Sequence, residues 1–474
     1  MKYKKITIII TTKNCKDYLV AALASINEHA TIVDEVILWN DGDDEQVPDD
    51  IQMKDGITLV QMNMGGTPAG LCTATNICMD LAKNQWVFLM HDDMIAGPHF
   101  DVNLLKYTED EQTIVSNKCI EPGIIDISQQ FIHMDLGKTI AEFDHVAFKK
   151  KVLEIQESPE PVAFDEISYP LLISKSLFKA VGGLDTQFNT GPLNDPDLFY
   201  RLYIMKCEHD ENITFIRSPD SVLYHFSGKA TRFRGDDTKL DDSWGLVEEE
   251  NYFRFIRKWG ESQKYKFGAL INTKLRHPIK EKELGLVILI KNNIELLEQN
   301  TFKLYHNFFD EVVLVDDMSD NFEEVEKFAS RYDNVKVVQH ALDKNFAAQR
   351  NFGQDQLNTE WIFQLDADET FESPLIESLR YLVRTSPKNI YTIGMPRMNL
   401  IDNIQTKVYP DTQFRLNRKH VKWIGNVHEH PEIQMKNTGI VKAHIVHSKT
   451  KKDYNKQQEF YDKIKDGAGA KRYD

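Results

Sequence analysis

The chain has 474 residues, of which 41% are hydrophobic and 27% are charged, and its formal net charge is −16. This length allows two or three domains with cores of their own, and the ordinary composition argues against a disordered or fibrous class. The strong negative charge argues against a surface that coats nucleic acid, although a local basic groove remains compatible with it. Such acidity also suits sites that hold metal cations.

Two features of the sequence bear on its compartment. The apolar runs of the predicted strands at residues 6–10 and 286–290 span five residues each, whereas a membrane span needs about 20 residues and the core of a signal peptide about 7–15. The five cysteines are odd in number and show no zinc-ligand spacing, so neither a disulfide framework nor a zinc site is expected. We therefore expect a cytoplasmic protein without a transmembrane segment.

The first half of the chain alternates predicted strands with predicted helices. The strands lie at residues 4–14, 33–39, 57–62 and 86–90, and the helices at 18–26 and 71–82, with a turn at 65–68. A βαβαβ series of this kind implies a parallel, doubly wound α/β sheet with right-handed crossovers. The carboxyl ends of the strands form the edge at which such sheets bind ligands.

Acidic residues follow two of these strands. NDGDD (residues 40–44) closes the second strand, and HDD (residues 91–93) follows the fourth. Neighbouring carboxylates repel each other unless a cation lies beside them, and hard divalent ions prefer such oxygen ligands. A solvated loop after a strand would also explain either cluster taken alone.

The same series restarts at residue 284. LGLVILI (284–290) mirrors the first strand, and VVLVDD (312–317) mirrors the second strand with its acidic end. WIFQLDADE (361–369) mirrors WVFLMHDDM (86–94) at a distance of 275 residues. A period this long indicates a duplicated domain. Because both copies place carboxylates at equivalent strand ends, a binding role is favoured over a solvated loop.

These patterns predict four segments. They are an N-terminal domain at residues 1–260, a helical linker at 261–283, a second domain at 284–448 and a polar tail at 449–474. The tail is rich in lysine and is predicted to be solvated. We assign it no chemistry.

The motifs resemble, in their order and spacing, the inverting nucleotide-sugar glycosyltransferases of family 2, which have the GT-A fold. In the first half the resemblance is carried by ITIIITTKN, VILWNDGDD, TATNICMDLAKNQWVFLMHDD, VGGLDTQFNTGPLNDPDLFYRL and YHFSGKATRF. In the second half it is carried by VVLVDDMSD, KNFAAQRNFGQ, WIFQLDADE and WIGNVHE, which look like the subset found among lipopolysaccharide-core transferases. The resemblance implies two tandem GT-A domains, each Rossmann-like with a mostly parallel sheet.

The resemblance also implies residues that bind the nucleotide-sugar donor, a nucleoside diphosphate sugar. These residues are Thr11, Thr12, Asp41, Asp92, Asp317, Arg350 and Asp366. The first copy departs from the second at one of them, because Thr75 stands where the second copy has Arg350. This departure puts the nucleotide affinity or the donor choice of the first copy in doubt.

A divalent metal ion, Mn²⁺ or Mg²⁺, is implied as the cofactor. Asp93 and Asp368 would hold it against the donor diphosphate, where it neutralises the negative charge that grows on the leaving group. His225 resembles the late metal-binding histidine of the family, and His447 is chosen over His444 as its counterpart. Hydrogen bonding within a core would also explain His225.

Inverting transfer requires a base that takes the proton of the acceptor hydroxyl. In NDPDLFYRL the first candidate is Asp195 and the second is Asp197, although helix capping would also explain Asp195. In the second copy, WIGNVHE offers His428 and Glu429, and Glu429 is the candidate by its position.

We therefore expect a bifunctional glycosyltransferase of polysaccharide biosynthesis that transfers hexosyl or pentosyl groups to a glycan or glycolipid, either free in the cytoplasm or peripheral to the membrane that carries the acceptor. Different acceptors are expected at the two sites, because 132 residues separate Asp93 from His225 but 79 separate Asp368 from His447. Four alternatives stay open. They are a single catalytic domain beside a degenerate binding domain, transfer to a modified nucleic-acid base, a sugar nucleotidyltransferase, and a non-enzymatic glycan-binding protein.

Overall fold

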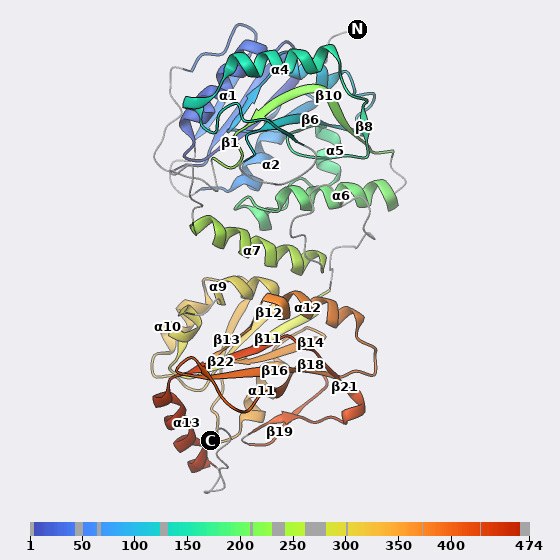
Figure 1. Cartoon of the computed structure of the whole chain (residues 1–474). Coiled ribbons are helices and arrows are strands. Elements are labelled where there is room, and N and C mark those ends of the chain that lie inside the picture. The colour runs from blue at the N-terminus through green and yellow to red at the C-terminus, as the bar shows by residue number, and fades with distance from the viewer. Residues whose placement is uncertain are drawn as a thin grey trace. The chain divides into compact units, whose positions relative to one another are not determined.

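The computed structural model describes residues 4–42, 51–63, 68–123, 131–208, 212–229, 242–260, 281–299, 302–371, 373–426 and 428–464. The described residues up to Tyr252 form one compact unit, and those from Phe253 onward form a second (Figure 1). Asp43, Asp44, residues 65–67 of the predicted turn and residues 261–280 of the predicted linker lie outside the described residues.

The first unit is built on a mixed sheet with the strand order β3-β2-β1-β4-β9-β6-β10-β5. The first four strands in this order run parallel, β9 runs antiparallel to both of its neighbours, and β5 pairs antiparallel with β10. The strands are β1 (Ile6–Thr12), β2 (Val33–Asn40), β3 (Thr58–Asn63), β4 (Trp86–His91), β5 (Met94–Ala96), β6 (Thr113–Glu121), β9 (Leu171–Ser174) and β10 (Thr214–His225).

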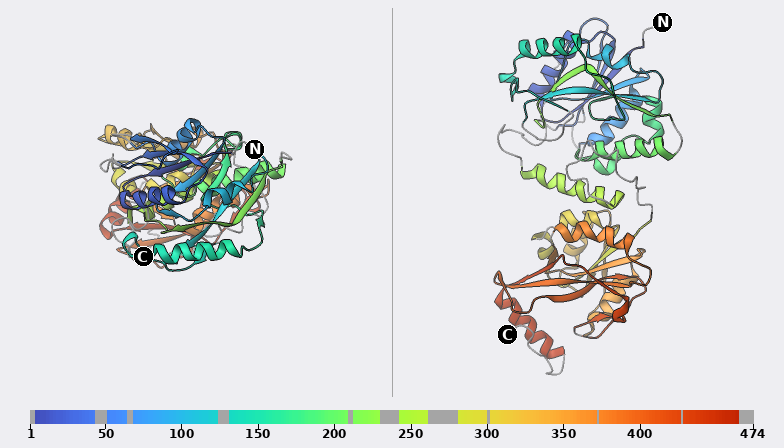
Figure 2. Two further views of the ribbon diagram at one scale, coloured as in Figure 1. Left: turned by 90° about the horizontal axis from the view of Figure 1, so that it is seen from above. Right: turned by 45° about the vertical axis from the view of Figure 1, so that its right-hand side comes forward.

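Helices cover both faces of this sheet, so the β-branched sequence of β1, ITIIITT, is buried on both sides. Ile8 and Ile10 share one core with Leu19 of α1 (Lys16–His29). α2 (Leu71–Leu81) lies against β1 and β2 from the other face (Figure 1 and Figure 2). This cover leaves the carboxyl ends of the parallel strands as the edge open to ligands.

The second unit repeats this topology. Its sheet has the order β13-β12-β11-β14-β18-β16-β22-β15, and each strand pairs in the same sense as its counterpart in the first sheet. The strands are β11 (Leu284–Ile290), β12 (Glu311–Asp316), β13 (Val335–Gln339), β14 (Trp361–Asp366), β15 (Glu369–Phe371), β16 (Thr392–Ile401), β18 (Asp411–Arg418) and β22 (Ile445–Lys449). α11 (Phe346–Asp355) packs on β11 and β12 as α2 packs on β1 and β2.

The other elements are shorter or lie at the periphery. The remaining helices are α3 (Phe100–Leu105), α4 (His145–Glu157), α5 (Lys175–Ala180), α6 (Asn194–Glu208), α7 (Asp242–Trp259), α8 (Ile294–Gln299), α9 (Phe302–Tyr305), α10 (Phe322–Ala329), α12 (Ser373–Thr385) and α13 (Lys451–Ile464). The remaining strands are β7 (Ile132–His133), β8 (Ala163–Phe164), β17 (Ile404–Gln405), β19 (Trp423–Ile424), β20 (His430–Pro431) and β21 (Thr438–Ile440), and 3₁₀ turns lie at Ile140–Glu142, Thr186–Phe188, His306–Phe308 and Met435–Asn437.

The α/β class and the duplication are confirmed, because the two sheets share one strand order. The expectation of a parallel sheet holds for four strands of each, and beyond them β9 and β18 enter antiparallel. An antiparallel strand needs no crossover helix, so the βαβ pattern of the sequence did not indicate it. Within the part of the chain that the structure describes, no helix combines the length and the apolar character that a membrane crossing requires.

Candidate active sites

The carboxyl ends of β1, β2 and β4 lie side by side and carry several predicted nucleotide-binding residues. In the registers of these strands, Thr12 lies opposite Asn40 and Thr11 lies opposite His91. The hydroxyl of Thr12 donates to Oδ2 of Asp92 at 2.7 Å. The structure therefore brings Thr11, Thr12 and Asp92 to one edge of the first sheet.

Asp41 follows β2 and holds the segment that leads into α2. Its carboxylate accepts hydrogen bonds from the backbone N–H groups of Ala69 at 2.7 Å and Gly70 at 2.9 Å, and from Nε1 of Trp39 at 3.2 Å. Gly70 has a φ of +85°, and a Cβ there would lie 2.7 Å from the side chain of Asn189. Only glycine fits this turn without strain.

Asp93 faces two imidazole rings at the same edge. One ligand atom from each of His91, Asp93 and His225 lies within 4.8 Å of the others. Nε2 of His225 is 3.4 Å from Oδ1 of Asp93, and its Nδ1 is 2.6 Å from Oε1 of Glu121. The other oxygen of Glu121 is buried without a hydrogen-bond partner in the described part of the chain. The Glu121 carboxylate orients the ring, as carboxylates do for metal-binding histidines.

Burial and neighbouring charge set the protonation of this group. Burial alone would raise the pKa of Asp93, but the charge and hydrogen bond of His225 outweigh it and hold that pKa well below its usual range. Burial alone would lower the pKa of His225, but Asp93 and Glu121 raise it to about 10. Burial lowers the pKa of His91 to about 4. The His91 ring is therefore neutral near pH 7 and offers a lone pair to a cation.

Asp195 lies in the first turn of α6. Its Oδ1 accepts a hydrogen bond from Nδ2 of Asn194 at 3.0 Å, and burial raises the pKa of Asp195 to about 7. The ring of Tyr169 stacks on His91 with 4.2 Å between centroids. Burial raises the pKa of Tyr169, and the nearby charges of Asp195 and Asp92 raise it further. Asp195 therefore acts electrostatically on the tyrosine that stacks on His91, and its pKa suits a general base.

Asp197 and Thr75 have partners inside the fold. Asp197 is fully buried, and its Oδ2 is 2.9 Å from Nε of Arg201 one helical turn later. The hydroxyl of Thr75 donates to the carbonyl of Leu71 at 2.9 Å. A cation thus neutralises Asp197, whereas the hydrogen bond of Asp195 comes from an uncharged amide.

Asp317 occupies in the second unit the place that Asp41 has in the first. The N–H of each donates at 2.9 Å to the last residue of the neighbouring strand, β11 or β1. The carboxylate of Asp317 accepts from the N–H of Leu342 at 2.7 Å and pairs with Nζ of Lys291 at 2.8 Å.

Arg350 joins three parts of the second unit. It projects from α11 with 1% of its surface exposed, and its Nη2 is 2.6 Å from Oδ1 of Asp366 while its Nε is 2.7 Å from Oε1 of Glu429. Its guanidinium lies over the ring of Trp423 at 5.1 Å. Burial alone would raise the pKa of Asp366, but Arg350 and Arg415 outweigh it and hold that pKa well below its usual range.

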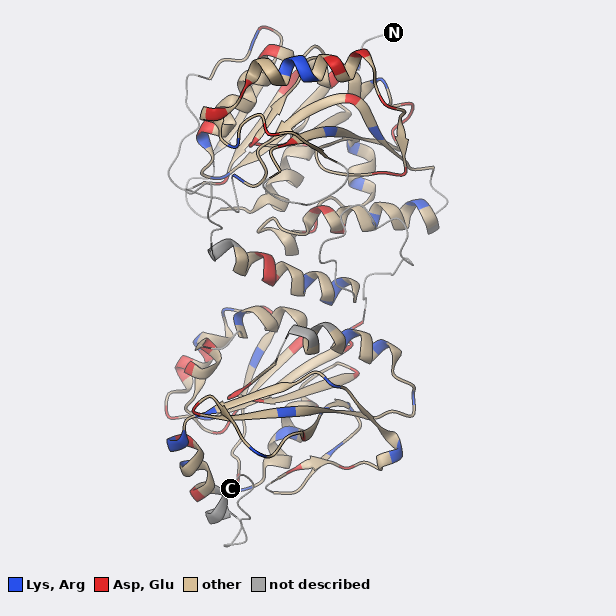
Figure 3. Cartoon of the chain, in the orientation of Figure 1, with Lys and Arg blue, Asp and Glu red and all other residues tan. Residues whose placement is uncertain are grey.

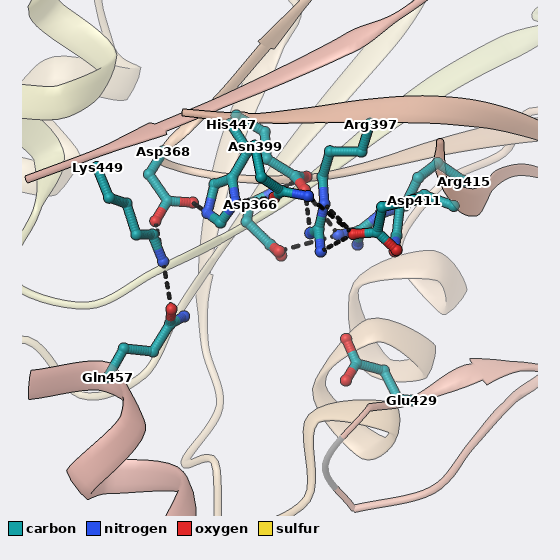
Figure 4. Close-up of polar contacts among 12 residues, drawn as sticks. Asp366, Asp368, Arg397, Asn399, Asp411, Arg415, Glu429, His447, Lys449 and Gln457 are labelled. Carbon is teal, nitrogen blue, oxygen red and sulfur yellow. Dashed lines mark hydrogen bonds and ion pairs between the residues drawn. The ribbon is translucent and has the colours of Figure 1, made fainter. Parts of the chain in front are cut away.

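Asp368 and His447 face each other, as their counterparts do in the first unit. Nε2 of His447 is 3.5 Å from Oδ1 of Asp368, and its Nδ1 is 2.8 Å from Oδ1 of Asn399 (Figure 4). A third group is present, because Nζ of Lys449 is 2.8 Å from Oδ2 of Asp368. His444, the other histidine considered, contacts a tyrosine hydroxyl instead.

Arginines and carboxylates occupy the rest of this edge. Nη2 of Arg415 is 3.0 Å from Oδ2 of Asp366, and Nη2 of Arg397 is 2.7 Å from Oδ2 of Asp411 (Figure 4). Both arginines also pair with Oε1 of Glu369, at 2.9 Å each. Figure 3 shows blue bands, which mark lysine or arginine, on strands of the second sheet. The two units therefore share a backbone arrangement but differ in the charges that line it.

The sequence matches the model of glycosyl transferase family 2 over residues 7–152 and again over residues 286–442, which together make up more than half of the chain. The chain belongs to glycosyl transferase family 2. Each matched segment lies in one of the two compact units, so each unit carries a family 2 domain. No curated protein matches the sequence.

Solved glycosyltransferase structures resemble parts of this family 2 chain. The structure of GalNAc-T7 with UDP, GalNAc and Mn²⁺ is 12% identical over 54% of this chain and 48% of its own, with a TM-score of 0.39. Mannosyltransferase PcManGT from Pyrobaculum calidifontis, in complex with GDP-Man and Mn²⁺, is 16% identical over 53% of this chain and 63% of its own, with a TM-score of 0.35. S. aureus TarS is 13% identical over 53% of this chain and 43% of its own, with a TM-score of 0.34. The matched region thus spans about half the length of GalNAc-T7 and less than two thirds of the other two.

The two family 2 domains differ in how well their residues fit a divalent ion. In the first domain the neutral imidazole of His91, the imidazole of His225 and the carboxylate of Asp93 converge, and a transition-metal ion such as Mn²⁺ accepts imidazole beside carboxylate ligands. His225 is protonated near pH 7 and would release its proton to bind the ion. In the second domain the ammonium group of Lys449 already contacts the carboxylate of Asp368. A divalent ion and an ammonium group at one carboxylate repel each other, so these residues do not fit the ion.

Several residues of the family 2 sites were missed by the sequence analysis. His91 entered only as the first letter of HDD. Glu121, which contacts His225, lies at the end of a strand for which no motif was recognised. Lys449 was placed in the polar tail, yet it is the last residue of β22. The charged residues of DTQFRLNR were the available signal for Arg415, because arginine is rare inside a sheet unless it is paired.

Proposed function

We propose that this chain is a cytoplasmic glycosyltransferase with two active sites, each of which transfers a hexosyl or pentosyl group from a nucleoside diphosphate sugar to a glycan or glycolipid acceptor. The proposal rests on a contact that both units share. In each unit, the aspartate after β4 or β14 lies beside a histidine of β10 or β22, the strand that pairs with the edge strand. His225 pairs in register with Met94, and His447 pairs with Glu369, each beside the aspartate loop. Family 2 membership of both units supports this reading.

At the first site, Asp93, His225 and His91 would hold Mn²⁺ or Mg²⁺. When bound, such an ion supplies a Lewis acid that neutralises the charge growing on the departing diphosphate. Thr12 and Asp92 stand at the edge where the donor would lie, and their hydrogen bond positions both groups.

The proposed base of the first site is Asp195. The acceptor hydroxyl oxygen attacks the anomeric carbon, and its proton passes to the carboxylate of Asp195. The bond between that carbon and the diphosphate oxygen breaks on the opposite face, and the nucleoside diphosphate leaves with the electron pair. A direct displacement of this kind inverts the anomeric configuration. Burial keeps the pKa of Asp195 near 7, which matches a base that works at neutral pH.

At the second site, Glu429 is the proposed base, and Asp317, Arg350 and Asp366 are the proposed donor-binding residues. Arg350 links Asp366 to Glu429 through contacts of 2.6 and 2.7 Å. A guanidinium group in this position holds the candidate base beside the candidate donor site. It can also donate charge-assisted hydrogen bonds to the oxygens of a diphosphate.

A second candidate function is transfer at one site only. It is favoured by one difference between the copies, because Thr75 bonds back to its own helix where the second unit has the buried cation Arg350. In this case the first unit would bind the acceptor and the second would catalyse transfer.

The test begins with a thermal-shift screen of nucleotide-sugars, with and without Mn²⁺, because a ligand that binds the folded state raises its melting temperature. Sugar transfer is then measured by mass spectrometry for Asp93→Asn and Asp368→Asn separately. We expect each variant to lose one transfer by about 100-fold or more and to keep the other.

Matched controls remove a surface charge from the same unit. Asp80→Asn and Asp355→Asn change carboxylates that are 68% and 56% exposed, and both should retain the two transfers. A single-site enzyme would show no loss in one of the two site variants with every donor and acceptor tested. A nucleotidyltransferase would instead release pyrophosphate.

A further inference from the structure

In the second site the ammonium group of a lysine contacts the aspartate that corresponds to Asp93. Nζ of Lys449 lies 2.8 Å from Oδ2 of Asp368 and 2.6 Å from Oε1 of Gln457 in α13, and 9% of the lysine side chain is exposed (Figure 4). Asp368 thus receives Lys449 on one oxygen and His447 on the other. The helix that follows the last strand therefore contributes to the site by holding this lysine through Gln457.

The first site has a small hydroxyl at the matching position. Lys449 comes two residues after His447, and Ser227 comes two residues after His225. The hydroxyl of Ser227 is buried and has no hydrogen-bond partner among the residues that the structure describes. The same backbone position thus carries a hydroxyl in the first unit and an ammonium group in the second. In the first unit, Oδ2 of Asp93 accepts hydrogen bonds from the backbone N–H groups of Gly228 and Lys229, both at 3.1 Å, instead of from a lysine side chain.

The two sites also differ at the position of His91. The site has Asp366 where the first has His91, so one of the three converging ligands of the first site is replaced by a carboxylate bound to Arg350 and Arg415. Nη1 of Arg350 is buried without a hydrogen-bond partner in the described residues. A guanidinium N–H left in this way is suited to an anionic oxygen of a ligand.

We propose that Lys449 is a donor-binding residue that replaces the divalent ion at the second site, so that this site binds its nucleoside diphosphate without a metal while the first site requires one. This inference rests on the proposed function. Ammonium and guanidinium groups donate charge-assisted hydrogen bonds to phosphate oxygens, and Lys449 and Arg350 supply both from buried, fixed positions. The first site has the hydroxyls of Ser227 and Thr75 at these two positions and therefore depends on an added cation.

The test uses the full-length Asp93→Asn variant, in which the first site is disabled. Binding of ADP, CDP, GDP and UDP is measured by calorimetry in EDTA and in Mn²⁺. We expect one of these nucleotides to bind with an affinity that differs by less than about twofold between the two conditions. Adding Lys449→Ala should weaken that binding in EDTA by about 10- to 100-fold. Lys449→Arg should keep most of it, and Lys452→Ala, which removes an exposed charge of α13, should not alter it.

Three other results would contradict the proposed role of Lys449. Binding that occurs in Mn²⁺ and disappears in EDTA overturns the role of Lys449 but leaves a transferase site in the second unit. Unchanged affinity in Lys449→Ala overturns it as well. If none of the four nucleotides binds under either condition, the proposed function of the second site fails together with this inference. Circular dichroism of each variant shows whether a loss of affinity reflects a loss of fold.

Discussion

Asp195 and Glu429 have the same proposed role but different surroundings. The hydrogen bond of Asp195 comes from the neutral side chain of Asn194, and burial raises its pKa to about 7. Glu429 instead accepts a hydrogen bond from Nε of the buried Arg350 at 2.7 Å. A guanidinium group thus faces the second candidate base and a neutral amide faces the first, and the raised pKa of Asp195 gives the first site a predicted pH dependence.

The first prediction concerns this pH dependence. In the Asp368→Asn background, which isolates the first site, kcat/KM should fall by about tenfold per pH unit below pH 7, because protonation removes the base. Above pH 7 the carboxylate of Asp195 is ionised and the rate should level off. Asp195→Asn should lose activity at every pH. A flat profile between pH 5.5 and 8 in the Asp368→Asn background would exclude Asp195 as the base.

The second prediction concerns Arg350, which is buried between Asp366 and Glu429. Arg350→Met leaves these carboxylates without their main cation, and the loss of one partner from a buried ion pair costs about 3–5 kcal/mol. Because the Asp366 side chain is 34% exposed, we expect the lower end of this range in urea unfolding of the second unit. Arg331→Met, which breaks an ion pair of a 51% exposed arginine, serves as the control and should cost less than about 1 kcal/mol.

At the scale of elements, the helix before the fourth strand is bound in both units to a segment far along the chain, which is the turn at Leu184 in the first unit and β19 in the second. Nδ2 of Asn76 donates to the carbonyl of Leu184 and its Oδ1 accepts from the N–H of Leu184, both at 2.8 Å. Asn351 makes the same two bonds with Trp423, at 2.9 and 2.8 Å. The proposed bases follow these segments in the chain. α2 and α11 therefore help to position them through these asparagines, together with Thr73, which accepts from and donates to Asn189, and Arg350, which donates to Glu429.

The third prediction tests this connection. Asn351→Ala removes both hydrogen bonds to Trp423, and two unsatisfied backbone groups cost about 2 kcal/mol where they are partly buried. We expect faster amide exchange at Trp423 and a lower transfer rate at the second site, because the loop that carries Glu429 is loosened. Asn76→Ala should affect only the first site. Unchanged exchange at Trp423 would show that the asparagine does not hold the loop.

At the scale of the whole molecule, each unit has its own sheet and its own buried core. Phe88 in β4 and Phe363 in β14 stand at equivalent positions, and both are fully buried. Units with separate cores can unfold as separate cooperative transitions.

The fourth prediction uses this equivalence. Phe88→Ala should lower the melting temperature of the first unit, and Phe363→Ala that of the second, each by the equivalent of about 3–5 kcal/mol. Differential scanning calorimetry should resolve two transitions, and each variant should shift one of them. A nucleoside diphosphate should likewise raise the transition of the unit that binds it. A single transition that both variants lower equally would show that the units unfold together.

The sequence by itself determined the duplication, the α/β class and the acidic edge of each sheet. These features are local, because a buried strand requires a run of apolar residues and an acid directly after it must lie at the strand end. Asp41, Asp93, Asp317 and Asp368 could therefore be placed before any contact was known. Family 2 membership follows from the same motifs in their order.

The family resemblance paired Asp93 with His225 and Asp368 with His447, but only the tertiary structure decided how these residues meet and which further side chains join them. His225 reaches Asp93 across 132 residues of chain because β10 pairs with β5, and Lys449 reaches Asp368 because β22 pairs with β15. Pairings between strands that are far apart in the sequence produce no periodic pattern of residues. The direction in which a side chain points produces none either. The same acidic motif therefore faces two imidazoles in one unit and a lysine in the other, and this difference in charge arises from contacts that local patterns do not specify.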